Sequence, residues 1–229
     1  MFFEIPGSPN QDLLDCPDRI IGHSPRPLSY ALLNEQVLIP RPDTETWLEK
    51  VIQYYRNETG LKVADLGTGS GAILVGFLYY CRDAVGVGVD ISTEALKIAE
   101  ENGQNLKITD RVEWRQGDYL KAFDEEDIFD GIFSNPPYIP TKDIGGLSRE
   151  VKHEPRLALD GGTDGLYFYH LLAKGAAEHL KPGGFLAVEF GIGQATDILE
   201  MFRKSAQYED FEVIKDYGGI ERALYCRKK

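Results

Sequence analysis

The four residues Asn135-Pro136-Pro137-Tyr138 follow a short, largely apolar run, Ile128 to Phe133, which predicts a buried strand. Neither proline has an N–H group, and each biases the preceding residue toward extended geometry, so neither a strand ladder nor a helix continues normally through them. We therefore expect a rigid corner at the carboxyl end of a strand. There the Asn135 carboxamide and the Pro136 carbonyl can accept hydrogen bonds, and the Tyr138 ring can cover a flat group. Two such acceptors suit recognition of an –NH2 group, whereas a plain turn is the alternative.

A glycine-rich segment upstream, Asp65-Leu66-Gly67-Thr68-Gly69-Ser70-Gly71, lies between a predicted strand and a predicted helix. Its glycines let the turn tighten and let a ligand approach the backbone, and the helix N-terminus favours an anionic group. The spacing G-x-G-x-G departs from the G-x-G-x-x-G of dinucleotide-binding proteins. Asp65 could hold an ammonium group, which S-adenosylmethionine has and NAD lacks. An NAD-linked dehydrogenase and plain turn glycines remain the alternatives for this segment.

Two more acidic residues follow predicted strands. Asp90 comes about 20 residues after the glycine turn, where a carboxylate can accept both hydroxyls of a ribose. Asp118 follows the next strand and could accept from an adenine amino group. Because the carboxyl ends of parallel strands meet at one edge of a sheet, Asp65, Asp90 and Asp118 together predict an adenosine pocket at the topological switch point.

From residue 62 onward the pattern predicts alternating strands and helices, which is typical of an α/β fold with a mostly parallel sheet. Seven strands are expected, at 63–66, 85–89, 112–114, 128–134, 185–190, 211–214 and 222–226. The last two are too close together for a crossover helix, so we expect them to be antiparallel. Helices are expected from the glycine turn to Tyr80, from Ser92 or Thr93 to Asn105, from about 166 to 180 with a stop at Pro182-Gly183-Gly184, and at 195–205.

The N-terminal part of the chain has a different pattern. Residues 1–36 are predicted to form an irregular arm, and residues 37–229 the catalytic domain. A helix is expected over residues 44–56, capped by Asp43 or Thr44, with its apolar residues facing inward: Trp47, Leu48, Val51 and Ile52.

Composition limits the class of partner. The formal net charge of −12 argues against a bulk DNA or RNA substrate, because phosphate binding requires a basic footprint. It suits a small molecule or a basic protein partner. The three cysteines show no C-x-x-C spacing, so no metal site or disulfide framework is predicted. No targeting signal or membrane-spanning stretch is recognised, and the expected location is the cytoplasm.

With these residues assembled, the chain resembles the HemK/PrmC-type protein-glutamine methyltransferases, from about Pro25 to the end. Leu38-Ile39-Pro40-Arg41-Pro42-Asp43-Thr44-Glu45 is similar to that family's Ile-Pro-Arg-Pro-Glu-Thr-Glu motif. The stretch from Glu154 to Leu166 is similar to its Glu-Pro…Ala-Leu…Gly-Gly…Asp-Gly-Leu pattern. Taken jointly with the glycine loop and the proline corner, these motifs are specific.

The resemblance implies a Rossmann-like, class I S-adenosylmethionine-dependent methyltransferase fold. It implies methyl transfer from S-adenosylmethionine, with S-adenosylhomocysteine as product, to the side-chain amide of the glutamine in the Gly-Gly-Gln motif of peptide-chain release factors. By the resemblance, Asn135, Pro136 and Tyr138 are catalytic, and with Pro137 they bind the glutamine. The implied cofactor-binding residues are Arg41, Pro42, Thr44, Asp65, Gly67, Thr68, Gly69, Gly71, Asp90, Ile91, Asp118, Tyr119 and Asn135.

One departure from the family concerns partner docking. The family usually carries a helical N-terminal domain that grips the release factor, whereas here an irregular stretch is expected in its place. Three alternatives therefore stay open: methylation of an exocyclic amine in DNA or RNA, a non-catalytic S-adenosylmethionine-binding module, and the release-factor methyltransferase type that needs a zinc-binding activator subunit. The oligomeric state is left open.

Overall fold

The computed structural model of the chain describes residues 42–148, 151 and 154–229. The arm predicted for residues 1–36, the domain boundary at residue 37 and the predicted site residue Arg41 lie outside these residues. Of Pro42, the backbone alone is described. No helix in this part of the chain is long and apolar enough to cross a membrane.

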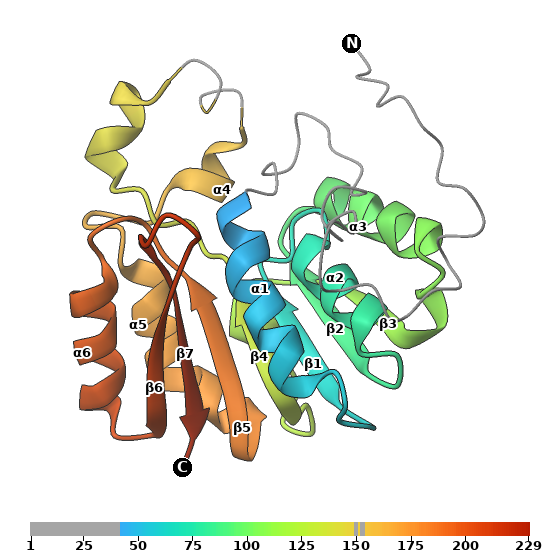
Figure 1. The fold of residues 1–229 in the computed structure, drawn as a ribbon. Helices are drawn as coiled ribbons and strands as arrows, with labels where there is room; N and C mark the ends of the chain where they lie inside the picture. The colour runs from blue at the N-terminus through green and yellow to red at the C-terminus, as the bar shows by residue number, and fades with distance from the viewer. Residues whose placement is uncertain (1–41, 149–150, 152–153) are drawn as a thin grey trace.

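Seven strands of the described chain form one sheet in the order β3-β2-β1-β4-β5-β7-β6 (Figure 1). Strand β7 pairs antiparallel with both of its neighbours, β5 and β6, and the other pairings are parallel. The predicted mostly parallel sheet with an antiparallel C-terminal strand is confirmed. The strands are β1 (Lys62–Leu66), β2 (Val85–Asp90), β3 (Val112–Gln116), β4 (Phe129–Ser134), β5 (Leu180–Glu189), β6 (Tyr208–Lys215) and β7 (Glu221–Lys228).

Helices cover both faces of the sheet (Figure 1). On one face lie α1 (Pro42–Tyr55), α2 (Ala72–Tyr80) and α3 (Thr93–Asn105), and on the other α5 (Tyr167–Gly175) and α6 (Ala195–Ser205). The short α4 (Arg156–Leu159) lies at the end of the sheet where α1 begins. Short 3-10 segments lie between these elements: η3 (Thr109–Arg111), η4 (Tyr119–Ala122), η5 (Thr141–Gly146) and η7 (Ala176–His179).

Most predicted elements are confirmed, but several boundaries were wrong: β5 and β6 begin at Leu180 and Tyr208, before the predicted 185 and 211, and one end each of α1 and α5 differs. Helix α1 begins at Pro42, so Asp43 and Thr44 lie in its first turn instead of capping it, because a proline is pre-organised for the first helical position. Helix α5 ends at Gly175, and Pro182-Gly183-Gly184 lie within β5. That stop signal marks an irregular strand: the β4–β5 register shifts between Phe129 and Gly131, and Gly183 has a φ of 73°.

Strand β4 is held in an aromatic part of the core, which matters because the proline corner follows it directly. The Phe185 ring stacks on Tyr55 with centroids 4.4 Å apart and meets Phe133 edge-on at 5.2 Å. The same ring lies over Gly131 of β4, where an added Cβ would come within 2.1 Å of it. Strand β4 therefore needs a residue without a side chain at this position, so that the Phe185 ring can pack across it.

We expect Gly131→Ala to destabilise the fold, because the Phe185 ring is fully buried and cannot move aside without disturbing its aromatic neighbours. Overpacking of this kind lowers the free energy of unfolding by about 1–3 kcal/mol. Urea unfolding followed by circular dichroism measures the change. Gly145→Ala is the matched control, since its Cβ would meet nothing within 4 Å. Equal stability of the two variants would contradict the packing argument.

Candidate functional site

A cavity of about 590 Å³ opens where the carboxyl ends of β1, β2 and β4 meet. The register aligns these ends, since Leu66 pairs with both Val89 and Ser134. The loops that follow the three strands are therefore brought together at the switch point of the sheet, as predicted. The predicted site residues that line the cavity are Thr44, Gly67, Thr68, Gly69, Asp90, Ile91, Asp118, Tyr119, Asn135 and Pro137.

The glycine loop after β1 turns over the end of β2. The N–H groups of Gly67 and Thr68 both donate to Val89 O at 2.9 Å. Gly69 has a φ of 57°, and an added Cβ there would meet nothing within 4 Å. The left-handed backbone explains the glycine, and the open space beside it lets a ligand approach the loop.

Asp90 is fixed at the end of β2 by backbone donors. Its Oδ2 accepts from Gly69 N at 2.8 Å and its Oδ1 from Ser92 N at 2.9 Å. Burial raises the pKa of Asp90, and these hydrogen bonds act in the opposite direction. Because each carboxylate oxygen has further acceptor capacity, the group can still accept a pair of hydroxyls from the cavity.

Asp65 is fully buried under the glycine loop and does not line the cavity itself. Its Oδ2 accepts from Thr68 Oγ1 at 2.6 Å, while its Oδ1 has no hydrogen-bond partner among the described residues. Burial raises the pKa of Asp65 to about 7; the Thr68 hydroxyl lowers it and the Asp90 carboxylate raises it further. A buried carboxylate with an unused oxygen favours a cationic group close by.

Tyr119 forms an aromatic wall after β3. Its ring stacks on Phe168 with centroids 4.6 Å apart at an interplanar angle of 27°, and both rings line the cavity. Asp118, beside it, is half-exposed and pairs with Lys121. A flat aromatic surface next to a carboxylate suits a purine with an exocyclic amine.

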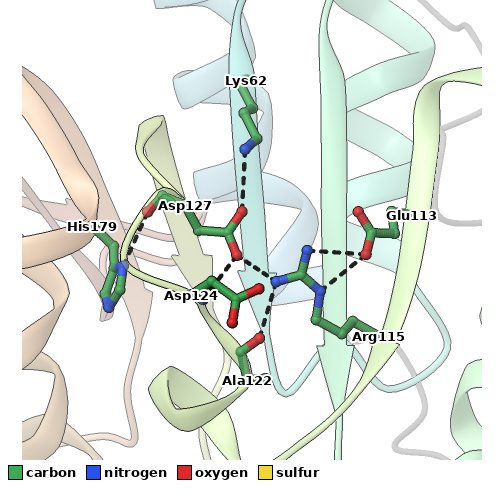
Figure 2. Close-up of polar contacts among 7 residues, drawn as sticks. All are labelled: Lys62, Glu113, Arg115, Ala122, Asp124, Asp127 and His179. Atoms are coloured by element: carbon green, nitrogen blue, oxygen red, sulfur yellow. Dashed lines mark hydrogen bonds and ion pairs between the residues drawn. The ribbon is translucent and has the colours of Figure 1, made fainter.

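Figure 2 shows an ion-pair network around Arg115 that also binds Ala122, the last residue of the 3-10 segment that begins at Tyr119. Arg115 of β3 donates to Ala122 O at 3.0 Å and pairs with Asp127, which also meets Lys62 at 3.3 Å. Burial alone would raise the pKa of Asp127, but hydrogen bonds from Arg115, the Asp124 backbone and Lys62 outweigh it and lower the pKa. The charged network therefore holds the loop between β3 and β4 at the point where it turns back.

The proline corner follows β4 directly. Ser134 Oγ donates to Leu66 O at 2.7 Å, which joins the end of β4 to β1. Asn135 lines the cavity, and its Oδ1 is buried with no hydrogen-bond partner in the described part of the chain. Pro137 also lines the cavity, whereas Pro136 and Tyr138 do not. The corner thus presents an unused acceptor beside the glycine loop.

Sequence reasoning missed one wall of the cavity, formed by α4 and the start of α5: Pro155, Leu157, Ala158, Tyr167 and Phe168. Leu157 and Tyr167 are 73% and 54% exposed, which is unusual for large apolar side chains. The signal for Pro155, Leu157 and Ala158 is the motif-like Glu154–Leu166 stretch, which ends just before Tyr167 and Phe168. The other lining residues that were missed are Ser70, Ala72, Ile73, Ser92, Glu94, Ala95 and Gly117.

Gly71 also does not line the cavity. An added Cβ there would come within 2.9 Å of the Trp114 ring and 3.0 Å of Ala99 Cβ, so the glycine serves the packing of α2 against its neighbours. The structure places Asp65, Gly71, Pro136 and Tyr138 outside the cavity lining, and the roles assigned to all of the predicted site residues, lining or not, stay predictions.

A buried carboxyl that the sequence did not reveal joins α1 to this end of the sheet. Glu189, the last residue of β5, accepts at Oε2 from Thr44 Oγ1 at 2.6 Å and from Trp47 Nε1 at 2.8 Å. Burial raises the pKa of Glu189, and the two hydrogen bonds lower it. The first turn of α1, which brings Thr44 to the cavity, is therefore held by a partner far away in the sequence.

Comparison with known proteins gives three findings. The family described as "Methyltransferase domain" matches residues 57–189. A release factor glutamine methyltransferase of Bradyrhizobium diazoefficiens is 44% identical over 200 residues, covering 86% of this chain and 67% of the relative. The chain thus spans about two thirds of that relative's length.

Solved structures show the class I methyltransferase fold. A methyltransferase from Pyrococcus furiosus superposes with a TM-score of 0.61 and 21% identity, covering 86% of this chain and 87% of that one. An RNA methyltransferase from Salinibacter ruber, solved in complex with S-adenosyl-L-homocysteine, gives a TM-score of 0.51 at 18% identity, with 84% and 94% covered.

The raised pKa of Asp65 predicts a pH-dependent stability. An unfolded aspartate titrates near 3.9, whereas the folded pKa is about 7, so the unfolded chain ionises first and the folded state loses stability as the pH rises between these values. Relative to Asp65→Asn, we expect the wild-type free energy of unfolding to fall by about 4 kcal/mol between about pH 4 and about pH 8. Urea titrations across this range measure it, and a constant difference would contradict the assignment.

Proposed function

The chain belongs to the release factor glutamine methyltransferase family, and we propose that it transfers a methyl group from S-adenosylmethionine to the side-chain amide nitrogen, N5, of a glutamine in a peptide-chain release factor. The observation that carries the proposal is that Asn135 lines the cavity together with the glycine loop, while its buried Oδ1 has no hydrogen-bond partner in the described part of the chain. A primary amide supplies the N–H donor that this oxygen lacks.

The cavity fits the methyl donor on two counts: Asp90 can accept the ribose hydroxyls, and the Tyr119–Phe168 wall can take the adenine ring. Asp65, buried under the glycine loop and outside the lining, adds negative charge that favours a cationic donor. When bound, S-adenosylmethionine supplies a methyl group activated by a positively charged sulfonium. The open space at Gly69 admits the ligand close to the backbone.

The corner residues act by orientation. An amide nitrogen is a poor nucleophile because its lone pair is delocalised into the carbonyl. Asn135 Oδ1 and the Pro136 carbonyl can each accept a hydrogen bond from one amide N–H, which fixes the plane of the glutamine amide and favours positive charge building on nitrogen. As the bond from nitrogen to the methyl carbon forms, the bond from that carbon to sulfur breaks, S-adenosylhomocysteine leaves, and one N–H proton is released to water. Orientation can contribute about 7–11 kcal/mol in the best cases, and preorganised dipoles add to it.

Apolar and aromatic residues of the cavity lining can exclude water from this step once substrate covers them. Leu157 and Tyr167 are lining residues that are exposed in the free protein, and Pro137 follows Asn135 by two residues in the same lining. Closing such surfaces over a bound peptide strengthens every hydrogen bond inside the cavity, because the local dielectric constant falls.

An exocyclic amine of a nucleic-acid base offers the same two N–H donors, so the corner alone does not choose between substrates. The net charge of −12 disfavours a polyanion. We therefore propose a protein glutamine as the substrate and include DNA and RNA in the test as the competing substrates.

Mass spectrometry of a release factor incubated with the enzyme and donor should show one added methyl on the Gly-Gly-Gln peptide, and none after Gln→Glu substitution there. Methylation of DNA or RNA in its place would refute the proposal.

Two variants should separate chemistry from donor binding. Asn135→Ala removes the unpartnered acceptor, so kcat should fall by at least about 10²-fold while S-adenosylhomocysteine still binds. Asp90→Ala removes the hydroxyl acceptor, so donor affinity should fall first. Isothermal titration with S-adenosylhomocysteine and a radiolabelled-methyl assay measure both quantities. Asn105→Ala, exposed at the end of α3, is the control, and an active Asn135→Ala enzyme would exclude the mechanism.

A further inference from the structure

The carboxamide of Gln194 joins three segments around the proline corner. Its Nε2 donates to Tyr138 O at 3.1 Å and lies 3.4 Å from Gly165 O. Its Oε1 accepts from Gly191 N at 2.8 Å. One side chain at the start of α6 therefore connects the corner, the glycine-containing loop before α5 and the loop after β5.

These segments approach one another too closely for any side chain to intervene. An added Cβ at Gly165 would come within 2.4 Å of Tyr138 O and 2.9 Å of Gln194 Nε2. An added Cβ at Gly191 would come within 2.9 Å of the Tyr138 ring. The two ends of the Gln194 carboxamide thus act on both sides of Tyr138: one end binds its carbonyl, and the other holds the backbone against which its ring packs.

The chemistry of the corner explains why a side-chain donor is needed there. Pro136 and Pro137 have no N–H groups, so the corner cannot anchor itself through donors at these positions. Hydrogen bonds anchor the chain on either side of the corner: Ser134 Oγ donates to Leu66 O at 2.7 Å, and Ile139 N donates to Leu159 O at 3.0 Å. Gln194 supplies a donor to the carbonyl between them.

We propose that Gln194 is a positioning residue for methyl transfer: by holding the Tyr138 carbonyl and the Gly191 backbone, it sets the direction in which Asn135 and Pro136 present their acceptor oxygens. This inference rests on the proposed function for its effect on turnover. Its structural part, the placement of the Tyr138 ring, is independent of the substrate. Gln194 does not line the cavity, so it acts through the corner.

The chain offers a matched control. Gln207, just beyond the other end of α6, is also partly buried, and its Nε2 donates to Ala173 O and Lys174 O, both at 3.2 Å. Gln194→Glu and Gln207→Glu make the same isosteric change: a carboxylate replaces two N–H donors that face backbone carbonyls. Gln194→Met is the second variant, because it keeps the length of the side chain, introduces no charge and forms none of the hydrogen bonds of the Gln194 carboxamide.

The test compares kcat and KM for a glutamine peptide, S-adenosylhomocysteine affinity, and the fluorine-19 NMR spectrum of protein labelled with 3-fluorotyrosine. The Tyr138 resonance is assigned with Tyr138→Phe. In both Gln194 variants we expect kcat to fall about 10- to 100-fold, KM and S-adenosylhomocysteine affinity to stay within about threefold, and the Tyr138 resonance to shift or broaden. Gln207→Glu should keep kcat within about twofold and leave that resonance unchanged.

The inference would be overturned by unchanged kcat in both Gln194 variants, by an unmoved Tyr138 resonance, or by an equal loss in Gln207→Glu. A parallel loss of S-adenosylhomocysteine affinity would also overturn it, because it would show general damage to the donor site. A wild-type enzyme inactive on every glutamine peptide would refute the proposed function instead, and the fluorine spectra would then decide the role of Gln194 by themselves.

Discussion

Two consecutive prolines at the end of a buried strand are the constraint on which the site depends. They cannot donate hydrogen bonds, so the backbone there offers acceptors that the sheet does not use. Strand β4 brings them to the switch point, and the Ser134–Leu66 bond fixes their starting position against β1. The unpartnered Oδ1 of Asn135 follows from the same geometry. Under the proposed function, the bend that ends the strand also supplies the acceptors that recognise N–H groups.

The donor side of the cavity relies on buried negative charge. Burial raises the pKa of both Asp65 and Asp90, and the Asp90 carboxylate makes ionisation of Asp65 less favourable still. The fold tolerates this because backbone N–H groups and the Thr68 hydroxyl compensate part of the desolvation. A cation placed beside Asp65 would remove the remaining cost, so the arrangement is better suited to a sulfonium donor than to a neutral or anionic ligand.

Much of this could be predicted because the informative residues are close together in the sequence. The alternation of strands and helices, the positions of Asp90 and Asn135 after their strands, and the Ser92 cap on α3 all follow from local patterns, and the structure confirms them. The wall formed by α4 could not be predicted this way, because a four-residue helix is too short to show a period. Gln194 and Glu189 were missed for another reason. Their partners lie far away in the chain, and nothing in a single glutamine or glutamate marks which carbonyl or indole it will meet.

The bond network of Glu189 has a consequence for the order in which the molecule is assembled. Thr44 and Trp47 meet this carboxyl across 145 and 142 residues of sequence. Before β5 is in place, Thr44 and Trp47 lack Glu189 as their acceptor. The hydrogen bonds that fix the first turn of α1 to the end of the sheet therefore cannot form. During synthesis from the N-terminus, the cavity wall next to Thr44 is therefore completed only after β5 has emerged. A nascent chain that already contains the glycine loop and the proline corner would still lack a finished donor pocket.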